Sequence, residues 1–212
     1  MRLSIDAEQR IIGLRDALWN CRSKTAAGLD RATLCRTLIP LLAQGQPISL
    51  AQVAAAISWP DDEVAAVLSQ HMNVEYDQDG RIVGAGLTLR PTPHQIKVDG
   101  RTLYAWCALD VLMYTPLLGR PVQADSPCAA TDVPVRMTIR PRQVDSIEPG
   151  TAVVSLLMPQ VGSGVRQAFC SHVNFFSSPE AATFWLAQHP GASILSIQEA
   201  YALGQQLLAQ SC

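Results

Sequence analysis

The chain has 212 residues, of which 48% are hydrophobic and 16% are charged. An average globular chain has about 25% charged residues, so this composition excludes extended disorder and indicates a compact core. A length of roughly 150 residues per domain allows one large domain, or a small domain joined to a larger one. The formal net charge of -2 gives no positive field for a polyanion, which disfavours nucleic acid as the main partner.

The N-terminal segment carries Asp6, Glu8 and Arg10 where a secretory signal needs an unbroken apolar stretch. No later window approaches about 18 uncharged apolar residues, so we expect a cytoplasmic protein without a membrane partner. A reducing compartment keeps cysteines as free thiols, which is how we interpret the six in this chain. Because no C-x-x-C or H-x-x-x-H pattern occurs, a compact zinc knuckle is excluded, and any metal site must be assembled by the fold.

Helical spacing predicts helices at residues 7–20 and 31–43. A cap at Ser49 predicts a short helix to Ile57, and Asp61-Asp62-Glu63 predicts the start of a fourth helix at 61–70. A hairpin is predicted next, with strands at 74–76 and 81–89 around a turn that ends at Gly80. Residues from about 25 to 90 therefore resemble a winged helix, and we place an N-terminal domain at 1–90.

The charge of this winged-helix-like unit argues against DNA binding. From Pro47 to Gly80 there are six carboxylates and no Lys or Arg. A recognition helix and wing must approach phosphates, which such a surface would repel. We therefore interpret the unit as a structural or lid-forming module.

Pro91 and Pro93 mark the boundary of a second domain at 91–212. A hairpin is predicted at 95–104 around Asp99-Gly100, followed by a helix at 105–114. The remaining elements are strands at 133–139, 152–158, 168–176 and 194–197 and helices at 178–188 and 198–210. The fold class is α+β: an N-terminal helical winged-helix-like unit, then a domain of mixed α/β content with an antiparallel sheet.

The first segment with candidate chemistry contains Cys107 and Asp110. If the helix begins near Ala105, Cys107 lies in its first turn, where free N–H groups and the helix dipole favour thiolate over thiol. Asp110 follows one turn later on the same face, so a proton can pass between its carboxylate and the sulfur. The residues alone leave a second interpretation open, in which Cys107 is a small buried hydrophobe and Asp110 an exposed helix residue.

The second segment surrounds Cys170. In a strand, Cys170, His172 and Asn174 would share one face, and a mixed polar face suits a site better than a core. A histidine is more often a hydrogen-bonded structural residue than a ligand, so we do not assign His172 a catalytic role. Cys128 follows a proline at a turn and is interpreted as a packing thiol. The remaining cysteines are assigned structural or incidental roles: Cys21, Cys35 and Cys212.

Three segments also carry a family resemblance: Arg101-x-Leu-Tyr-Ala-Trp-Cys-Ala-Leu-Asp110, Cys128-Ala-Ala-Thr131, and Val165-Arg-Gln-x-Phe-Cys170 followed by His172-Val173. They resemble the bacterial organomercurial lyases, also called alkylmercury lyases. Further matching segments are Trp59-Pro60, Glu75-Tyr76-Asp77, Gly86-Leu-Thr-Leu89, Glu199-Ala200 and Leu203-Gly-Gln205. The resemblance covers nearly everything from about residue 30 onward.

The resemblance implies an enzyme that cleaves the carbon–mercury bond by protonolysis, releasing a hydrocarbon and keeping Hg(II) on protein thiols. Cys107 and Cys170 match the family's mercury-binding cysteines, Asp110 its catalytic carboxylate, and Cys128 a structural cysteine. Mercury would thus be held at Cys107, Cys170 and Asp110. Ser171 stands where some members have a second cysteine, so this chain has no vicinal dithiol there.

The resemblance implies no prosthetic group. Hg(II) is the bound product, and external low-molecular-weight thiols are expected to support turnover. The expected partners are an organomercury substrate and then thiols or a mercuric reductase that accept Hg(II). Soft thiolates are the preferred protein ligands of a soft ion such as Hg(II), and nearby Tyr104, Trp106 and Leu109 suit an apolar pocket for the organic group.

Two other functions fit part of the pattern. One is a metal-responsive winged-helix regulator that binds a soft metal ion through cysteines without catalysis. In such a regulator Asp110 would have no role in proton transfer. The other is a zinc-structured domain that uses Cys107, Cys128, Cys170 and His172, which should copurify with stoichiometric zinc.

Overall fold

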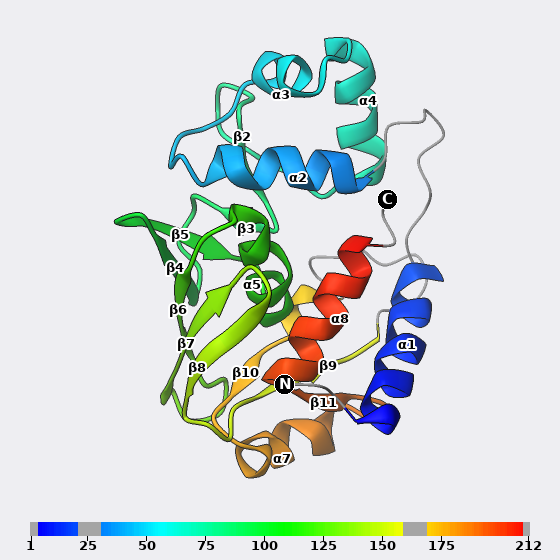
Figure 1. Cartoon of the computed structure of the whole chain (residues 1–212), viewed down its shortest axis with the longest axis vertical. Helices are drawn as coiled ribbons and strands as arrows, with labels where there is room; N and C mark the ends of the chain where they lie inside the picture. The colour runs from blue at the N-terminus through cyan, green and yellow to red at the C-terminus, as the bar shows by residue number, and fades with distance from the viewer. Residues whose placement is uncertain (1–3, 21–30, 159–168, 210–212) are drawn as a thin grey trace.

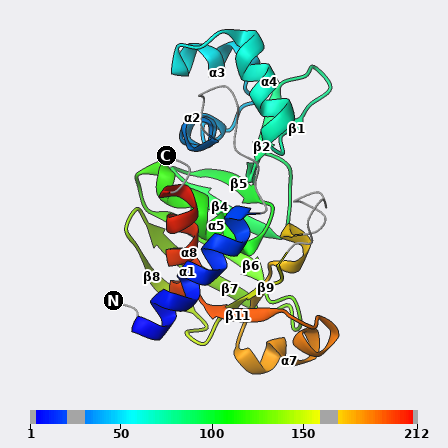
Figure 2. The same cartoon turned by 90° about the vertical axis from the view of Figure 1, so that its right-hand side faces the viewer.

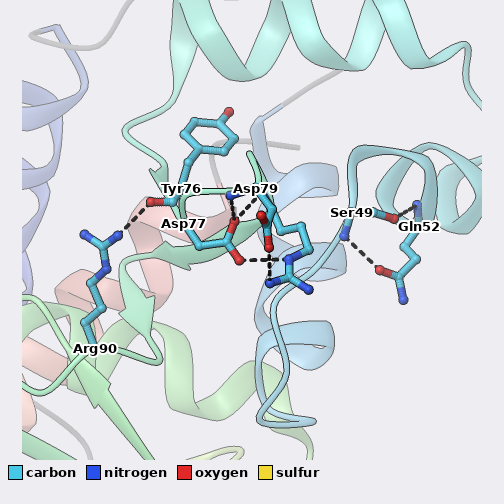
Figure 3. A network of polar contacts seen from close by, with 7 residues as sticks. Ser49, Gln52, Tyr76, Asp77, Asp79 and Arg90 are labelled. Atoms are coloured by element: carbon cyan, nitrogen blue, oxygen red, sulfur yellow. Dashed lines mark hydrogen bonds and ion pairs between the residues drawn. The ribbon is translucent and has the colours of Figure 1, made fainter.

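A computed structural model describes residues 4–20, 31–158 and 169–209. Its N-terminal part contains the four predicted helices: α1 (Ile5–Asn20), α2 (Arg31–Leu42), α3 (Leu50–Ile57) and α4 (Asp61–His71). The Ser49 side chain accepts a hydrogen bond from the Gln52 backbone N–H, and the Gln52 side chain accepts one from Ser49 N–H (Figure 3). This capping box satisfies N–H groups that have no partner inside the helix, which fixes where α3 begins.

Helices α2, α3 and α4 surround a small apolar core of their own, which includes Leu38, Val53 and Leu68. Helix α1 lies elsewhere, alongside the C-terminal helix α8 (Ile197–Ala209), as both Figure 1 and Figure 2 show. The Arg10 guanidinium donates to the Ile194 carbonyl and lies 3.7 Å from the Glu199 carboxylate. The first helix is therefore attached to the C-terminal part of the chain.

The hairpin after α4 has the expected turn but a shorter second strand. Strands β1 (Glu75–Tyr76) and β2 (Ile82–Ala85) pair antiparallel, and the Asp77 carboxylate accepts from the backbone N–H groups of Asp79 and Arg81 (Figure 3). The prediction of one strand over 81–89 is wrong. At Gly86 the chain has a φ of 92° and turns back, so that β3 (Leu87–Thr88) pairs antiparallel with β2.

The main sheet is entirely antiparallel and has the strand order β1-β2-β3-β5-β4-β6-β7-β8. The predicted hairpin is confirmed as β4 (His94–Val98) and β5 (Arg101–Ala105), joined by Asp99 and Gly100 with positive φ. The predicted strand at 133–139 is β7 (Pro134–Arg140). Strands β6 (Val122–Pro127) and β8 (Gln143–Glu148) were not predicted.

A second antiparallel sheet has the order β10-β9-β11, formed by β10 (Phe175–Phe176), β9 (Val153–Leu156) and β11 (Ser193–Ser196). The predicted strand at 168–176 is wrong in its described part, because Cys170–His172 form a 3-10 turn, η2, and only β10 is extended and paired. Helix α7 (Pro179–Gln188) begins after Ser178, whose hydroxyl accepts from the Ala181 N–H.

The core of the second domain surrounds helix α5 (Ala108–Tyr114), in which every residue is buried, and the 3-10 helix η1 (Thr115–Leu118) continues from it. Helix α8 packs against α5, and a Cβ on Gly204 would lie only 3.0 Å from the Met113 Cα (Figure 1). The α+β class with a helical N-terminal unit and antiparallel sheets is confirmed. Within the described residues, no helix is both long and apolar enough to cross a membrane.

Candidate active site

Cys107 occupies the junction between strand β5 and helix α5. The strand continues to Ala105, and the Trp106 N–H donates to the Gly86 carbonyl at 2.9 Å. Cys107 has an extended backbone and is the N-cap of α5, while the Ala108 N–H donates to the Val173 carbonyl at 3.0 Å. The helix therefore starts at Ala108, three residues later than predicted. Hydrogen bonds to the carbonyls of Gly86 and Val173 hold the chain on either side of Cys107, which stays extended.

Three side chains that the sequence singled out meet at this junction. The Cys107 Sγ donates to Asp110 Oδ2 at 3.1 Å, and the Cys170 Sγ lies 3.8 Å from the same oxygen. The candidate ligand atoms of all three residues lie within 4.8 Å of one another. Cys107 is fully buried, and Asp110 and Cys170 are each 7% exposed. The fold thus brings two distant cysteines to one carboxylate. The second interpretation is right that Cys107 is buried and wrong that Asp110 is exposed.

The environment of Cys107 favours the thiol over the thiolate. Burial raises the pKa of Cys107 well above its usual value, and the hydrogen bond with Cys170 and the negative charge of Asp110 raise it further. The expectation that the helix N-terminus would favour a thiolate at Cys107 is therefore wrong. Removing a sulfur from water next to a carboxylate outweighs the dipole of one short helix.

A narrow cleft opens onto this group. It is lined from both domains by Met72, Asn73, Ala85, Gly86, Trp106, Leu109, Asp110, Met113, Tyr114, Phe169 and Cys170. The free volume is only about 20 Å³, which is close to the space that one water molecule needs. The predicted Trp106 and Leu109 line this cleft, whereas Tyr104 does not, because it lies on β5 opposite Thr88 and Gln95.

Gly86 is a cleft residue whose role was not predicted. A Cβ at this position would lie 2.2 Å from the Tyr114 ring, and the positive φ also favours glycine. The Gly86 carbonyl holds the Trp106 N–H, directly before Cys107. The matching segment Gly86-Leu-Thr-Leu89 was the signal in the sequence, but the contact with Tyr114 depends on tertiary packing.

Cys128 lies apart from this group, as a buried residue at the start of an exposed turn next to β10. The Ala129 N–H donates to the Phe175 carbonyl, and the Ser177 hydroxyl donates to the Cys128 sulfur at 3.5 Å. Burial raises the pKa of Cys128, but hydrogen bonds from the Thr131 and Ser177 side chains and from the Ser177 and Ala130 backbone outweigh it and lower the pKa to about 7.

The four-residue zinc site finds no support in the described part of the chain. Neither Cys128 nor His172 belongs to the group formed by Cys107, Asp110 and Cys170. The His172 ring instead lies 5.3 Å from that of His189. Cys35 is buried in α2, and the interpretations of Cys21 and Cys212 concern residues outside the described ranges.

Comparisons with known proteins identify relatives that match most of the chain. Residues 87–209 match the family model described as alkylmercury lyase, and residues 9–86 match the helix-turn-helix domain of alkylmercury lyase. The crystal structure of the mercury-bound form of MerB2 superposes with a TM-score of 0.73 at 25% identity, covering 92% of this chain and 98% of that one.

Alkylmercury lyases from several bacteria are similar over most of their length. The chain is 48% identical to that of Streptomyces lividans over 181 residues, covering 85% of this chain and 84% of the relative. It is 50% identical to that of Staphylococcus epidermidis over 177 residues, covering 84% and 82%. Because two adjoining family models and these relatives match the same two domains, the chain belongs to the alkylmercury lyase family of enzymes.

Proposed function

We propose that this protein cleaves the carbon–mercury bond of organomercury compounds by protonolysis and retains Hg(II) on the thiolates of Cys107 and Cys170. The observation that carries the proposal is that one oxygen, Asp110 Oδ2, lies within reach of both sulfurs, at 3.1 and 3.8 Å. A carboxylate in this position can accept a proton from a thiol and return it to a carbon atom bound to the same metal.

The first step exchanges a proton for the metal. The Cys107 thiol gives its proton to Asp110 as the sulfur–mercury bond forms, because a thiol must lose its proton to become a ligand. Before substrate binds, the raised pKa keeps that proton in the site. The thiol is thus neutral until a soft cation, which prefers sulfur, replaces the proton.

The second step breaks the carbon–mercury bond. Cys170 joins the mercury as a second thiolate, which makes the metal more electron-rich and weakens its bond to carbon. Asp110 delivers one proton to the departing carbon, giving R–H. The substrate arrives as an organomercury cation bound to an external thiolate. The two cysteines lose two protons in total. One proton ends on the hydrocarbon, and the other protonates the departing external thiolate, which leaves as a free thiol.

The proposed product is Hg(II) on two thiolates, with no prosthetic group required. Ser171, which is exposed, follows Cys170 directly, so a neighbouring second thiol is absent from the η2 turn. We therefore propose that external low-molecular-weight thiols remove Hg(II), either for release or for hand-off to a mercuric reductase in the cytoplasm. Thiolate exchange on mercury allows such a transfer because the incoming ligand is equally soft.

We also propose that the N-terminal unit serves the enzyme and does not bind nucleic acid. Helix α4 begins with Asp61, Asp62 and Glu63, so its N-terminal end presents negative charge. Duplex DNA should show no salt-dependent affinity for the protein, and tight specific binding at physiological salt would instead favour the metal-responsive regulator.

The proposal is tested by incubating the protein with methylmercury or phenylmercury and excess thiol. We expect methane or benzene in the headspace, and in heavy water the methane should carry one deuterium, because the proton on carbon comes from exchangeable thiol and carboxyl groups. Absence of hydrocarbon would overturn the proposed activity. Methane without deuterium would overturn protonolysis while leaving cleavage intact.

A further inference from the structure

One wall of the cleft belongs to the helix-turn-helix unit. Met72 and Asn73 follow directly after α4, and they line the same cleft as Asp110 and Cys170. In the proposed reaction the organic group must lie close to Asp110, because the carboxyl delivers the proton to the carbon. The organic group therefore enters the space that Met72 borders.

Met72 is placed where the two hydrophobic cores of the molecule meet. Its side chain is partly buried and packs against both core clusters, one around α5 and the other around α2, α3 and α4. Its backbone N–H donates to the Leu68 carbonyl and so ends helix α4. A methionine side chain is unbranched and has three rotatable bonds, so it can change shape more cheaply than a branched residue can.

The backbone next to Met72 is held by polar contacts. The Thr88 hydroxyl donates to the buried Glu75 carboxylate at 2.5 Å, and the Arg90 guanidinium donates to the Tyr76 carbonyl at 2.7 Å (Figure 3). Both contacts tie β1 to the segment that leads into the second domain. The backbone of this wall is thus held through β1, and Met72, which is only partly buried, has more freedom to move than Met113, the buried methionine that also lines the cleft.

We propose that Met72 determines the size of the organic group that the enzyme accepts. This inference rests on the proposed function. The free volume of about 20 Å³ holds about one water molecule, so even a mercury atom with a methyl group must displace part of the wall. A phenyl group is several times larger, so its binding requires a larger displacement of the wall. In the part of the wall that comes from the helix-turn-helix unit, we expect the flexible side chain of Met72 to move aside first.

The test compares phenylmercury with methylmercury in variants of Met72. Met72→Ala should raise the ratio of kcat/KM for phenylmercury over methylmercury by about tenfold or more, because a few methylene-sized groups in a pocket discriminate at this level. Met72→Phe should lower the same ratio. Leu89→Ala is the matched control, because Leu89 also packs against both core clusters but does not line the cleft.

A merely structural role for Met72 would change both substrates equally, as we expect for Leu89→Ala. A phenyl-to-methyl ratio of binding affinities is measured without turnover. Each organomercurial is distributed between the protein and a competing external thiol, and its affinity for the protein follows from the distribution. A ratio that neither Met72 substitution changes, in cleavage or in binding, would overturn the inference. Failure of the wild type to release hydrocarbon would overturn the proposed function, and the binding ratio would still decide the role of Met72.

Discussion

Two fully buried cysteines of this molecule have opposite acidities. Cys107 and Cys128 are both 0% exposed, yet the pKa of Cys107 is raised well above the usual value and that of Cys128 is lowered to about 7. The difference lies in the depth of burial as well as in the partners, because Cys107 is enclosed among the buried residues of α5, whereas Cys128 directly precedes the exposed turn at 129–132. Cys107 faces the carboxylate of Asp110, which accepts its proton in a hydrogen bond, whereas Cys128 receives hydrogen bonds from hydroxyl and backbone N–H groups. Burial alone does not decide whether a thiol ionises.

The two environments therefore suit different roles. A neutral thiol beside a carboxylate can exchange its proton for a soft metal ion, because the carboxylate receives the proton. The sulfur of Cys128 is surrounded by donors that are already committed to it, and these donors hold its loop against Ser177, next to β10. We expect the first environment to affect turnover and the second to affect stability.

The largest effect on turnover is expected from replacing the sulfurs of Cys107 and Cys170. Cys107→Ser and Cys170→Ser should each nearly abolish hydrocarbon release, because a serine oxygen is a hard ligand with little affinity for mercury. Cys128→Ser should retain measurable cleavage, which makes it the matched control. Full activity in either of the first two variants would remove that cysteine from the mechanism.

Replacing the carboxylate separates chemistry from binding. Asp110→Asn should slow the single-turnover release of hydrocarbon by about 10²- to 10⁴-fold, because the amide can neither accept nor return a proton. The two thiols should still bind Hg(II), and the pKa of Cys107 should fall because a negative charge beside it is gone. Thiol titration by absorbance measures the second effect. A near wild-type single-turnover rate would mean that the proton comes from elsewhere.

The two thiols should also give opposite dependences of stability on pH. A folded-state pKa of about 7 for Cys128, against an ordinary value of 9.0, means that the unfolded chain binds more protons between these values. Stability therefore rises with pH across this window. For Cys107, the raised pKa makes the folded state hold its proton longer, so its contribution falls with pH above the ordinary value.

Urea unfolding at a series of pH values measures both contributions. The rise between about pH 7 and 9 should disappear in Cys128→Ser, and the fall at higher pH should weaken in Cys107→Ser. An unchanged rise in Cys128→Ser would show that another group titrates there.

The smallest effect is expected from removing one donor to Cys128. Ser177→Ala should raise the pKa of Cys128 toward its ordinary value and cost about 0.5–1.5 kcal/mol of stability, the usual contribution of one hydrogen bond. Ser146→Ala, an exposed position on β8, is the control and should change neither quantity. Equal stability of the two variants at pH 9 would argue against the Ser177 contact.

The sequence predicted the elements that carry clear local signals: helical spacing for α1 and α2, the Ser49 cap for α3, the acidic first turn for α4, and the Asp99-Gly100 turn for the hairpin of β4 and β5. It did not predict β8, because this edge strand is exposed on most of its length and has no clear alternation. The segment around Cys170 alternates like a strand, yet tertiary contacts bend it. The Ser155 hydroxyl donates to the His172 carbonyl and accepts from the Asn174 N–H.

The candidate site also has a part that local sequence predicts and a part that depends on tertiary packing. The spacing of Cys107 and Asp110 placed them together, as local helical geometry allows. The approach of Cys170 to these two residues was implied only by the family resemblance, because the spacing of residues along the sequence does not determine long-range packing. The cleft wall at Met72 and Gly86 could not be predicted either, since it exists only where the two domains touch.

The main sheet runs without interruption across the junction between the two domains. Strand β3 lies before Pro91 and pairs with β5, at Leu87 with Ala105 and at Thr88 with Tyr104. A shortened chain that began after Pro91 would therefore leave β5 with a row of unpaired N–H and C=O groups. Such bare edges recruit strands from other molecules. We therefore expect the second domain to be insoluble when it is expressed without the N-terminal unit.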